Sequence, residues 1–259
     1  MPSTADSVRS PDRRLGLRLA LALAAVFLAG VPFLALLLLV RAHWSPLWQA
    51  DLGVATDLHR TALRHPALVH TCAAVSTVFD PNVFRVTATA LAAWLLAGRR
   101  PRLAAWSLVT VWGGGLLDLL TKTAVGRARP RFDVTIAADV GKSFPSGHAL
   151  GSLIGCGVLL LVLLPLVRPA PVRRLCWPAV ALIVLAVGFA RVALGVHYLS
   201  DVLAGWVLGL AWLAATTAAF QAWRRELGGR PVAPASEGLE PEMQETDNTG
   251  GQHAAGRSG

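Results

Sequence analysis

Long apolar runs without charge constrain the fold of this chain more than any other feature, and the first extends from Leu19 to Val40. At about 1.5 Å per residue, a helix of this length crosses the roughly 30 Å hydrocarbon core of a bilayer. A cleaved secretory leader is the competing interpretation, because Arg13, Arg14 and Arg18 precede the run. Leaders have shorter apolar cores, of about 7–15 residues, so we expect an uncleaved first span.

Further apolar runs predict an all-α, polytopic membrane protein with six transmembrane helices. In residues 66–98, Asp80, Pro81 and Arg85 interrupt the apolar pattern, so we expect a bent helix there whose C-terminal part is buried. The composition agrees, with 54% hydrophobic and only 15% charged residues. The remaining runs are bounded by charged residues or by Pro and Gly, and they cover residues 103–120, 149–167, 175–190 and 202–222.

The chain divides into three regions on this interpretation. Residues 1–18 form a cytoplasmic N-terminal segment, and residues 19–227 form the six-helix membrane domain. Residues 228–259 are rich in Gly, Pro, Glu and Gln, which predicts a disordered cytoplasmic tail. Residues 43–66 mix Trp with polar side chains, which is typical of a helix or loop lying at the outer membrane interface.

The distribution of Arg predicts which membrane face each connection occupies. Basic residues cluster before the first span and after the second, fourth and sixth, so both termini are expected in the cytoplasm. The net charge of +9 is spread over these clusters rather than over one face, so we expect no nucleic-acid partner. The exceptions fall on the outer side and need another reason; they are Lys122, Arg127, Arg129, Arg131 and Arg191.

Three segments on the predicted outer side carry residues suited to phosphate chemistry. In "KTAVGRARP", Lys122 and Arg129 offer positive charge, although a pair of Lys122 with Asp118 on one helix face is the simpler interpretation. Arg127 and Arg131 are expected to face solvent or lipid headgroups. In "PSGH", Ser146 caps a helix, and the N–H groups of its first turn favour an oxyanion.

Histidine accompanies the anion-binding groups in two of these segments. His148 follows Gly147 and can donate a proton to a departing oxygen. In "RVALGVHYLSD", His197 and Asp201 are four apart, so on a helix the carboxylate fixes the imidazole tautomer and leaves the other nitrogen as a nucleophile. A metal site is the rival interpretation, but Lys122, Arg129 and Arg191 would repel a cation. We therefore expect neither a metal nor a cofactor.

In order, the three segments resemble the signature motifs of the type 2 phosphatidic acid phosphatase superfamily: Lys, six residues, Arg-Pro; then Pro-Ser-Gly-His; then Arg, five residues, His, three residues, Asp. The resemblance implies a metal-independent phosphatase with six helices and an outward-facing site. It implies that His197 is a nucleophile that forms a phosphohistidine, that Asp201 orients it, and that His148 is the general acid. It also implies phosphate binding by Lys122, Arg129, Ser146, Gly147 and Arg191.

One position departs from the family pattern, because Ala190 stands where the family commonly has Ser. A hydroxyl donor to the phosphate would then be missing, and we expect reduced but real activity.

The function expected from this resemblance is hydrolysis of a membrane lipid phosphate at the extracytoplasmic side of the cell membrane. Undecaprenyl diphosphate, phosphatidic acid and phosphatidylglycerol phosphate are the candidate substrates, and the bilayer is the other partner. A catalytically silent lipid-phosphate binder or transporter is the alternative. The related vanadate-dependent haloperoxidases share the anion pocket but are soluble proteins, which does not suit this chain.

Overall fold

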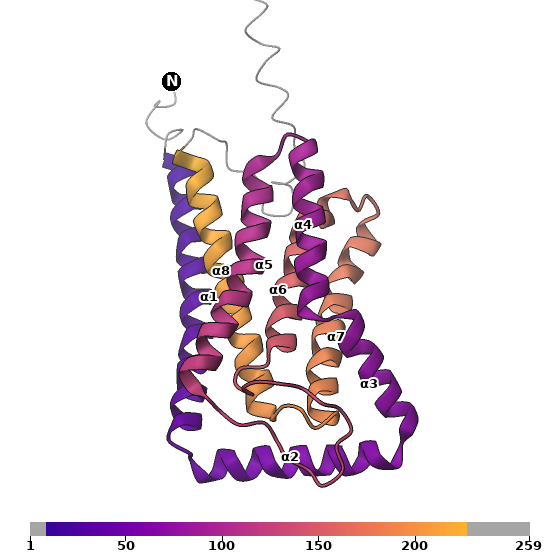
Figure 1. Ribbon diagram of the computed structural model, residues 1–259. Helices are drawn as coiled ribbons and strands as arrows, with labels where there is room; N and C mark the ends of the chain where they lie inside the picture. Colours follow the sequence, from indigo (N-terminus) through magenta and orange to yellow (C-terminus); the bar gives the residue numbers. More distant parts are fainter. Residues whose placement is uncertain (1–8, 227–259) are drawn as a thin grey trace, which may run out of the picture.

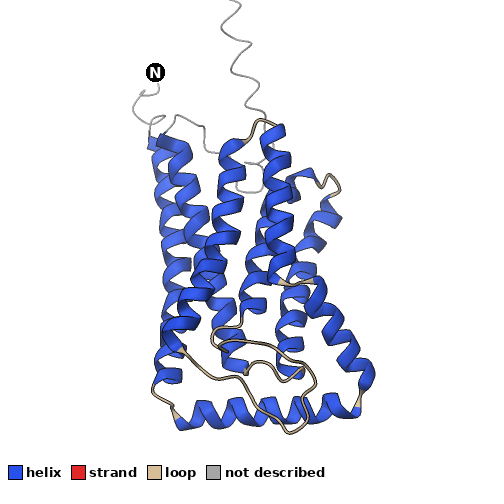
Figure 2. Ribbon diagram, in the orientation of Figure 1, coloured by secondary structure: helices blue, strands red, loops and turns tan. Residues whose placement is uncertain are grey.

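The computed structural model describes residues 9–226, and these residues form a bundle of helices (Figures 1 and 2). The predicted all-α fold is therefore confirmed. The predicted tail lies outside the described residues, as do the first eight residues of the predicted N-terminal segment. The elements in chain order are α1 (Arg9–Arg41), α2 (Ser45–Arg64), α3 (Pro66–Val78), α4 (Pro81–Ala97), α5 (Pro101–Val125), α6 (Gly147–Leu163), the 3-10 helix η1 (Leu164–Leu166), α7 (Ala170–Ala193) and α8 (Leu199–Glu226).

The predicted bent helix over residues 66–98 is two helices, α3 and α4, separated at Phe79 and Asp80. Pro81 has no N–H to donate and begins a new helix, and Asp80 caps that helix by accepting from the N–H of Asn82 at 2.7 Å. The sequence placed the interruption correctly. The part expected to be buried was residues 86–98; Ala88, Leu91, Ala92 and Leu95 are buried there, and Phe84 is buried before it.

Packing inside the bundle joins α4, α5, α6 and α8 through one apolar core. Phe84, Leu95, Ile154 and Val158 are among its buried side chains. Large apolar side chains also cover the outside of the bundle, for example Val86, which is 70% exposed. A surface with so many exposed apolar side chains is adapted to lipid rather than to water.

Four described helices are long and apolar enough to cross a bilayer: α5, α6 continued by η1, α7, and α8 up to Ala222. The part of α1 from Val26 adds a fifth if it is counted together with α2, which is bent away from it by 93°. The chain is thus a multi-pass membrane protein. The count of six spans stays a prediction.

Helix α2 lies across one end of the bundle (Figure 1). Its buried residues are Asp51, Ala55, His59 and Ala62, whose spacing of three or four places them on one face. The loop of residues 126–146 lies at the same end. The N-terminal end of α1 and the C-terminal end of α8 lie at the opposite end (Figure 1). Of the two possibilities predicted for residues 43–66, a helix or a loop, the structure has a helix, and its place at a membrane surface stays a prediction.

Candidate active site

His197 and Asp201 meet at the start of α8, at the end of the bundle that α2 crosses. His197 is 1% exposed and lies in the turn before α8, whereas Asp201 lies in the first turn of the helix. His197 Nδ1 lies 3.5 Å from Asp201 Oδ2, and the same oxygen accepts the N–H of Tyr198 at 2.9 Å. The prediction of two residues on one helix face was therefore wrong in detail: the pair forms across a helix start, where the carboxylate also holds the turn.

The contacts of His197 define which ring nitrogen carries the proton. Nη1 of Arg129 lies 3.0 Å from Nε2, and because a guanidinium only donates, Nε2 must be the acceptor. The proton is then on Nδ1, which faces Asp201 and, at 3.4 Å, the hydroxyl of Ser143. That hydroxyl donates to Asp201 and can accept from Nδ1. His197 thus presents an unprotonated Nε2 to the group that Arg129 would bind.

The environment of His197 also favours its neutral form. Burial lowers its pKa to about 4, against the opposing effect of Asp201 and together with the charges of Arg129 and Arg191. A neutral imidazole at pH 7 keeps the lone pair that a nucleophile needs. Burial and the arginines therefore keep His197 neutral, which is the form that the predicted nucleophile requires.

Arg129 and Arg191 converge on one carboxylate. Arg129 lies 3.1 Å from Asp139, and Nη2 of Arg191 donates to the same carboxylate oxygen. Arg129 is fixed further by donating to the carbonyl of Val196 at 2.8 Å. Two guanidinium groups that share one carboxylate can also share an oxyanion such as phosphate.

The "PSGH" segment enters α6 beside Lys122. Ser146 is fully buried and caps α6 by accepting from the N–H of Ala149 at 3.5 Å, while its own N–H donates to the carbonyl of Asp201 at 2.9 Å. A Cβ added to Gly147 would lie 2.8 Å from Nζ of Lys122, so a side chain at this position would displace the ammonium group. Lys122 also makes the expected helical pair with Asp118, at 2.7 Å.

His148 has a carboxylate partner that the sequence analysis did not identify. Its Nε2 lies 3.3 Å from Oδ2 of Asp80, whose other oxygen caps α4. The break between α3 and α4 therefore serves the site, because it places a carboxylate beside the predicted general acid.

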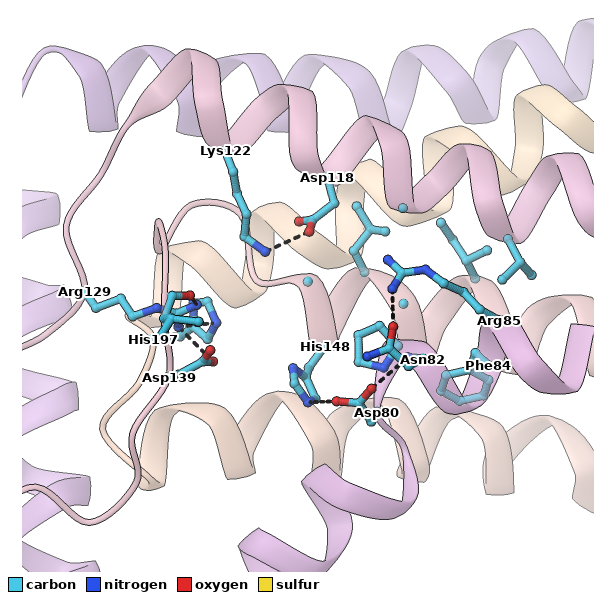
Figure 3. A pocket seen from close by; sticks show the side chains of 18 residues that line it. Asp80, Asn82, Phe84, Arg85, Asp118, Lys122, Arg129, Asp139, His148 and His197 are labelled. Atoms are coloured by element: carbon cyan, nitrogen blue, oxygen red, sulfur yellow. Dashed lines mark hydrogen bonds and ion pairs between the residues drawn. The ribbon is translucent and has the colours of Figure 1, made fainter.

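These groups surround a cavity of about 240 Å³ between α4, α5 and α6 (Figure 3). Five of the predicted site residues line it: Lys122, Arg129, Gly147, His148 and His197. The other three, Ser146, Arg191 and Asp201, are behind this lining and contact it through their hydrogen bonds. Within residues 9–226, no group of three or more His, Cys, Asp or Glu side chains is arranged to hold a metal ion.

Arg127 corrects one prediction. It was expected to face solvent or lipid headgroups, but its side chain is only 8% exposed and lies 2.6 Å from Asp201 and 2.7 Å from Asp51. It also donates to the hydroxyl of Ser200 at 2.7 Å. The two buried carboxylates explain the difference, since they supply the counter-charge that solvent would otherwise provide. Arg131 is exposed, as predicted.

Ala190 directly precedes Arg191 near the end of α7. It is buried in an apolar cluster with Cys72, Ala193 and Val196 and is not among the residues that line the cavity. The expectation that the missing hydroxyl lowers activity stays a prediction.

Four residues that contact the predicted site residues or Arg127 were not predicted from the sequence: Asp51, Asp80, Asp139 and Ser143. Asp80 was signalled as a helix cap by the following Pro81, and Asp51 by its place on the buried face of α2. Asp139 and Ser143 belong to a loop without periodicity, and no local signal marks them.

Comparisons with known proteins agree with this geometry. The sequence profile of the PAP2 superfamily matches residues 103–225, which contain all three motifs. The chain is 35% identical over 125 residues to a lipid A 1-phosphatase of Rhizobium johnstonii, covering 44% of this chain and 46% of that protein. It is 34% identical over 98 residues to phosphatidylglycerophosphatase B of Bacillus subtilis, covering 37% of this chain and 47% of that protein. The chain thus spans about half the length of the curated relatives it matches.

A solved structure shares the fold. The crystal structure of a transmembrane PAP2 type phosphatidylglycerolphosphate phosphatase from Bacillus subtilis superposes with a TM-score of 0.62 at 22% identity, covering 77% of this chain and 96% of the other. Fold and site together define a helical membrane protein with a buried histidine beside two arginines. Residues 103–225, which hold the three motifs, match the model of the PAP2 superfamily, and this match confirms the resemblance of the motifs.

Proposed function

We propose that this protein is a metal-independent lipid phosphate phosphatase or diphosphatase that works through a phosphohistidine. The observation that carries the proposal is the buried, neutral His197, whose Nε2 faces Arg129 and whose Nδ1 faces Asp201. The candidate substrates are undecaprenyl diphosphate, phosphatidic acid and phosphatidylglycerol phosphate. The names of the relatives, which are phosphatases of lipid A and of phosphatidylglycerophosphate, support a lipid substrate.

In the first step, Nε2 of His197 attacks phosphorus and the bond from phosphorus to the leaving oxygen breaks. The negative charges of Asp80 and of the bound phosphate favour the protonated form of His148, which gives its proton to that oxygen. Arg129, Arg191, Lys122 and the N–H of Gly147 bind the phosphoryl oxygens, on which negative charge gathers in the transition state. Asp201 and Ser143 hold the Nδ1 proton of His197 throughout.

In the second step, water attacks the phosphohistidine. His148, now neutral, takes a proton from this water, and the bond from phosphorus to Nε2 breaks. Inorganic phosphate leaves, and both histidines return to their starting states. No group other than these side chains and water is needed for the balance of protons and electrons.

The site faces the extracytoplasmic side in this proposal, and both chain ends are cytoplasmic. The arrangement of the bundle supports this orientation, because the N-terminal end of α1 and the C-terminal end of α8 lie opposite the site (Figure 1). Basic clusters between the spans favour the cytoplasm for that end. The additional span that brings the count to six would be α4. Its 17 residues are few for a helix that crosses a bilayer.

The test is phosphate release by the purified protein in detergent with excess EDTA, from each candidate lipid, with His197→Ala as the control. Release that persists in EDTA and disappears in His197→Ala is the expected result. Release abolished by EDTA would contradict the phosphohistidine mechanism. A folded protein that binds these lipids but releases no phosphate would favour the catalytically silent binder instead.

A further inference from the structure

Arg85 is a cation inside the membrane domain that the proposed reaction does not use. It lies on the second turn of α4, lines the cavity, and donates to the side chain of Asn82 at 2.5 Å. Its guanidinium lies 5.9 Å from the ring centre of Trp112. A charged side chain within a predicted membrane span is a functional candidate, and Arg85 is half-buried.

The other charges of the cavity are paired, and Arg85 is not. Lys122 pairs with Asp118, Arg129 with Asp139, and His148 with Asp80. Asp118 interacts with Arg85 at longer range, but its ion pair is with Lys122. Among residues 9–226, no carboxylate lies within ion-pairing distance of Arg85. Of the described cations that line the cavity, Arg85 is therefore the one without a carboxylate partner.

The position of Arg85 relates this charge to the leaving group. Figure 3 shows His197 and Arg129 on one side of His148, and Arg85 with Asn82 on the other. A general acid must stand beside the leaving oxygen, so the region beyond His148 receives the part of the substrate that departs. Apolar side chains line the cavity there, among them Phe84, Val111 and Ile154, and are suited to the hydrocarbon that follows.

The guanidinium of Arg85 occupies space that is open because residue 115 of α5 is glycine. A Cβ added to Gly115 of α5 would lie 2.7 Å from Nη2 of Arg85 and 3.1 Å from its Nε. Any larger residue at 115 would move the guanidinium. The close approach of α5 thus fixes the charge within the cavity instead of letting it extend along the helix surface.

On these observations, which rest on the proposed function, we propose that Arg85 and Asn82 form a subsite for a second phosphate on the leaving group. The preferred substrate is then a lipid with two phosphates, one cleaved at His197 and one bound at Arg85. Two sources provide this chemistry: the inner phosphate of a polyprenyl diphosphate, and the diester phosphate of a phosphatidylglycerol phosphate.

The experiment compares kcat/KM for two matched pairs of lipids. Undecaprenyl diphosphate is paired with undecaprenyl monophosphate, and phosphatidylglycerol phosphate with phosphatidic acid, so each pair keeps its tail and changes the second phosphate. Arg85→Gln is expected to lower kcat/KM about 10- to 100-fold for the two-phosphate member of at least one pair, the loss of one charge-assisted contact. The single-phosphate members should change less than about three-fold. The affected pair identifies the source.

Two further variants separate charge from structure. Gly115→Ala keeps the charge, suits a helix, and displaces the guanidinium, so it should lower the same kcat/KM values in the same direction. Arg60→Gln removes an exposed cation from α2 and should leave both pairs unchanged. Equal losses on one-phosphate and two-phosphate lipids in Arg85→Gln, or no preference in the unaltered protein, would overturn the subsite.

Failure of the proposed function would look different, because the unaltered protein would then hydrolyse none of the four lipids. The subsite is judged in that case by binding to His197→Ala, measured as the rise in Tm that each lipid produces in detergent. A larger rise for the two-phosphate lipids that disappears in the double variant with Arg85→Gln supports the subsite. Equal rises within each pair would overturn it.

Discussion

The carboxylate of Asp139 lies 3.1 Å from Nη1 of Arg129, the same nitrogen that lies 3.0 Å from Nε2 of His197. Asp139 also pairs with Arg191, so one carboxylate occupies both arginines proposed to bind phosphate. A bound phosphate has to share these arginines with Asp139 or displace it. The carboxylate of Asp139 therefore competes with a bound phosphate for the two arginines.

Asp139→Asn should strengthen inhibition by inorganic phosphate. Removal of the negative charge leaves the two arginines free for the oxyanion, and we expect the inhibition constant to fall by up to about ten-fold. The measurement is product inhibition of lipid phosphate hydrolysis, and Asp133→Asn, an exposed position in the same loop, is the control. Weaker inhibition in Asp139→Asn would mean that the carboxylate positions the arginines instead of competing for them.

Arg127→Met should destabilise the protein far more than Arg131→Met. The first change leaves two buried carboxylates, Asp51 and Asp201, without their shared cation, which costs about 3–5 kcal/mol. The second removes an exposed charge. Thermal unfolding in detergent provides the comparison, and equal Tm values for the two variants would contradict the buried network.

The dependence of kcat/KM on pH should show the protonation of His197 on its acid side. Burial holds its pKa at about 4, so lowering the pH toward that value protonates Nε2 and removes the nucleophile. We expect kcat/KM to fall on the acid side through this titration, in addition to any effect of the second ionisation of the substrate phosphate, at about pH 6.

Asp201→Asn separates the two titrations. Its carboxylate favours the imidazolium, so the amide should lower the pKa of His197 further and move its inflection to lower pH, with a lower rate. The inflection due to the substrate should not move. An acid inflection of His197 that shifts to higher pH would contradict the assigned contacts.

Asp80→Asn should slow the release of poor leaving groups selectively. Asparagine still caps α4 but no longer stabilises the protonated His148. We expect kcat for a lipid phosphate to fall about 10- to 100-fold and kcat for p-nitrophenyl phosphate, whose leaving group needs little protonation, to change much less. Asp57→Asn on the exposed face of α2 is the control. An equal loss on both substrates would assign Asp80 a purely structural role.

The sequence was most informative where structure is local. Apolar runs and prolines at helix starts located the helices, and Asp80 with Pro81 located the break between α3 and α4. The three motifs brought His148, His197 and Arg129 to one cavity, because each motif lies at a helix end and these ends meet.

The partners of these residues could not be predicted, because they come from distant parts of the chain. Arg127 is 76 residues from Asp51 and 74 from Asp201, and no local pattern distinguishes its buried ion pairs from contact with lipid headgroups. Asp139 lies in an irregular loop, where the position of a side chain depends on tertiary contacts. The sequence therefore predicted the reacting groups better than the groups that hold them.

Arg127, the cation shared by Asp51 and Asp201, constrains how the sequence of this protein can change in evolution. Loss of Arg127 alone leaves two buried negative charges, and loss of one carboxylate leaves the other paired but changes the charge beside His197. Single replacements at these positions therefore cost folding stability that joint replacements need not cost. Positions 51, 127 and 201, from α2, a loop and α8, should vary together among descendants of this chain or not at all.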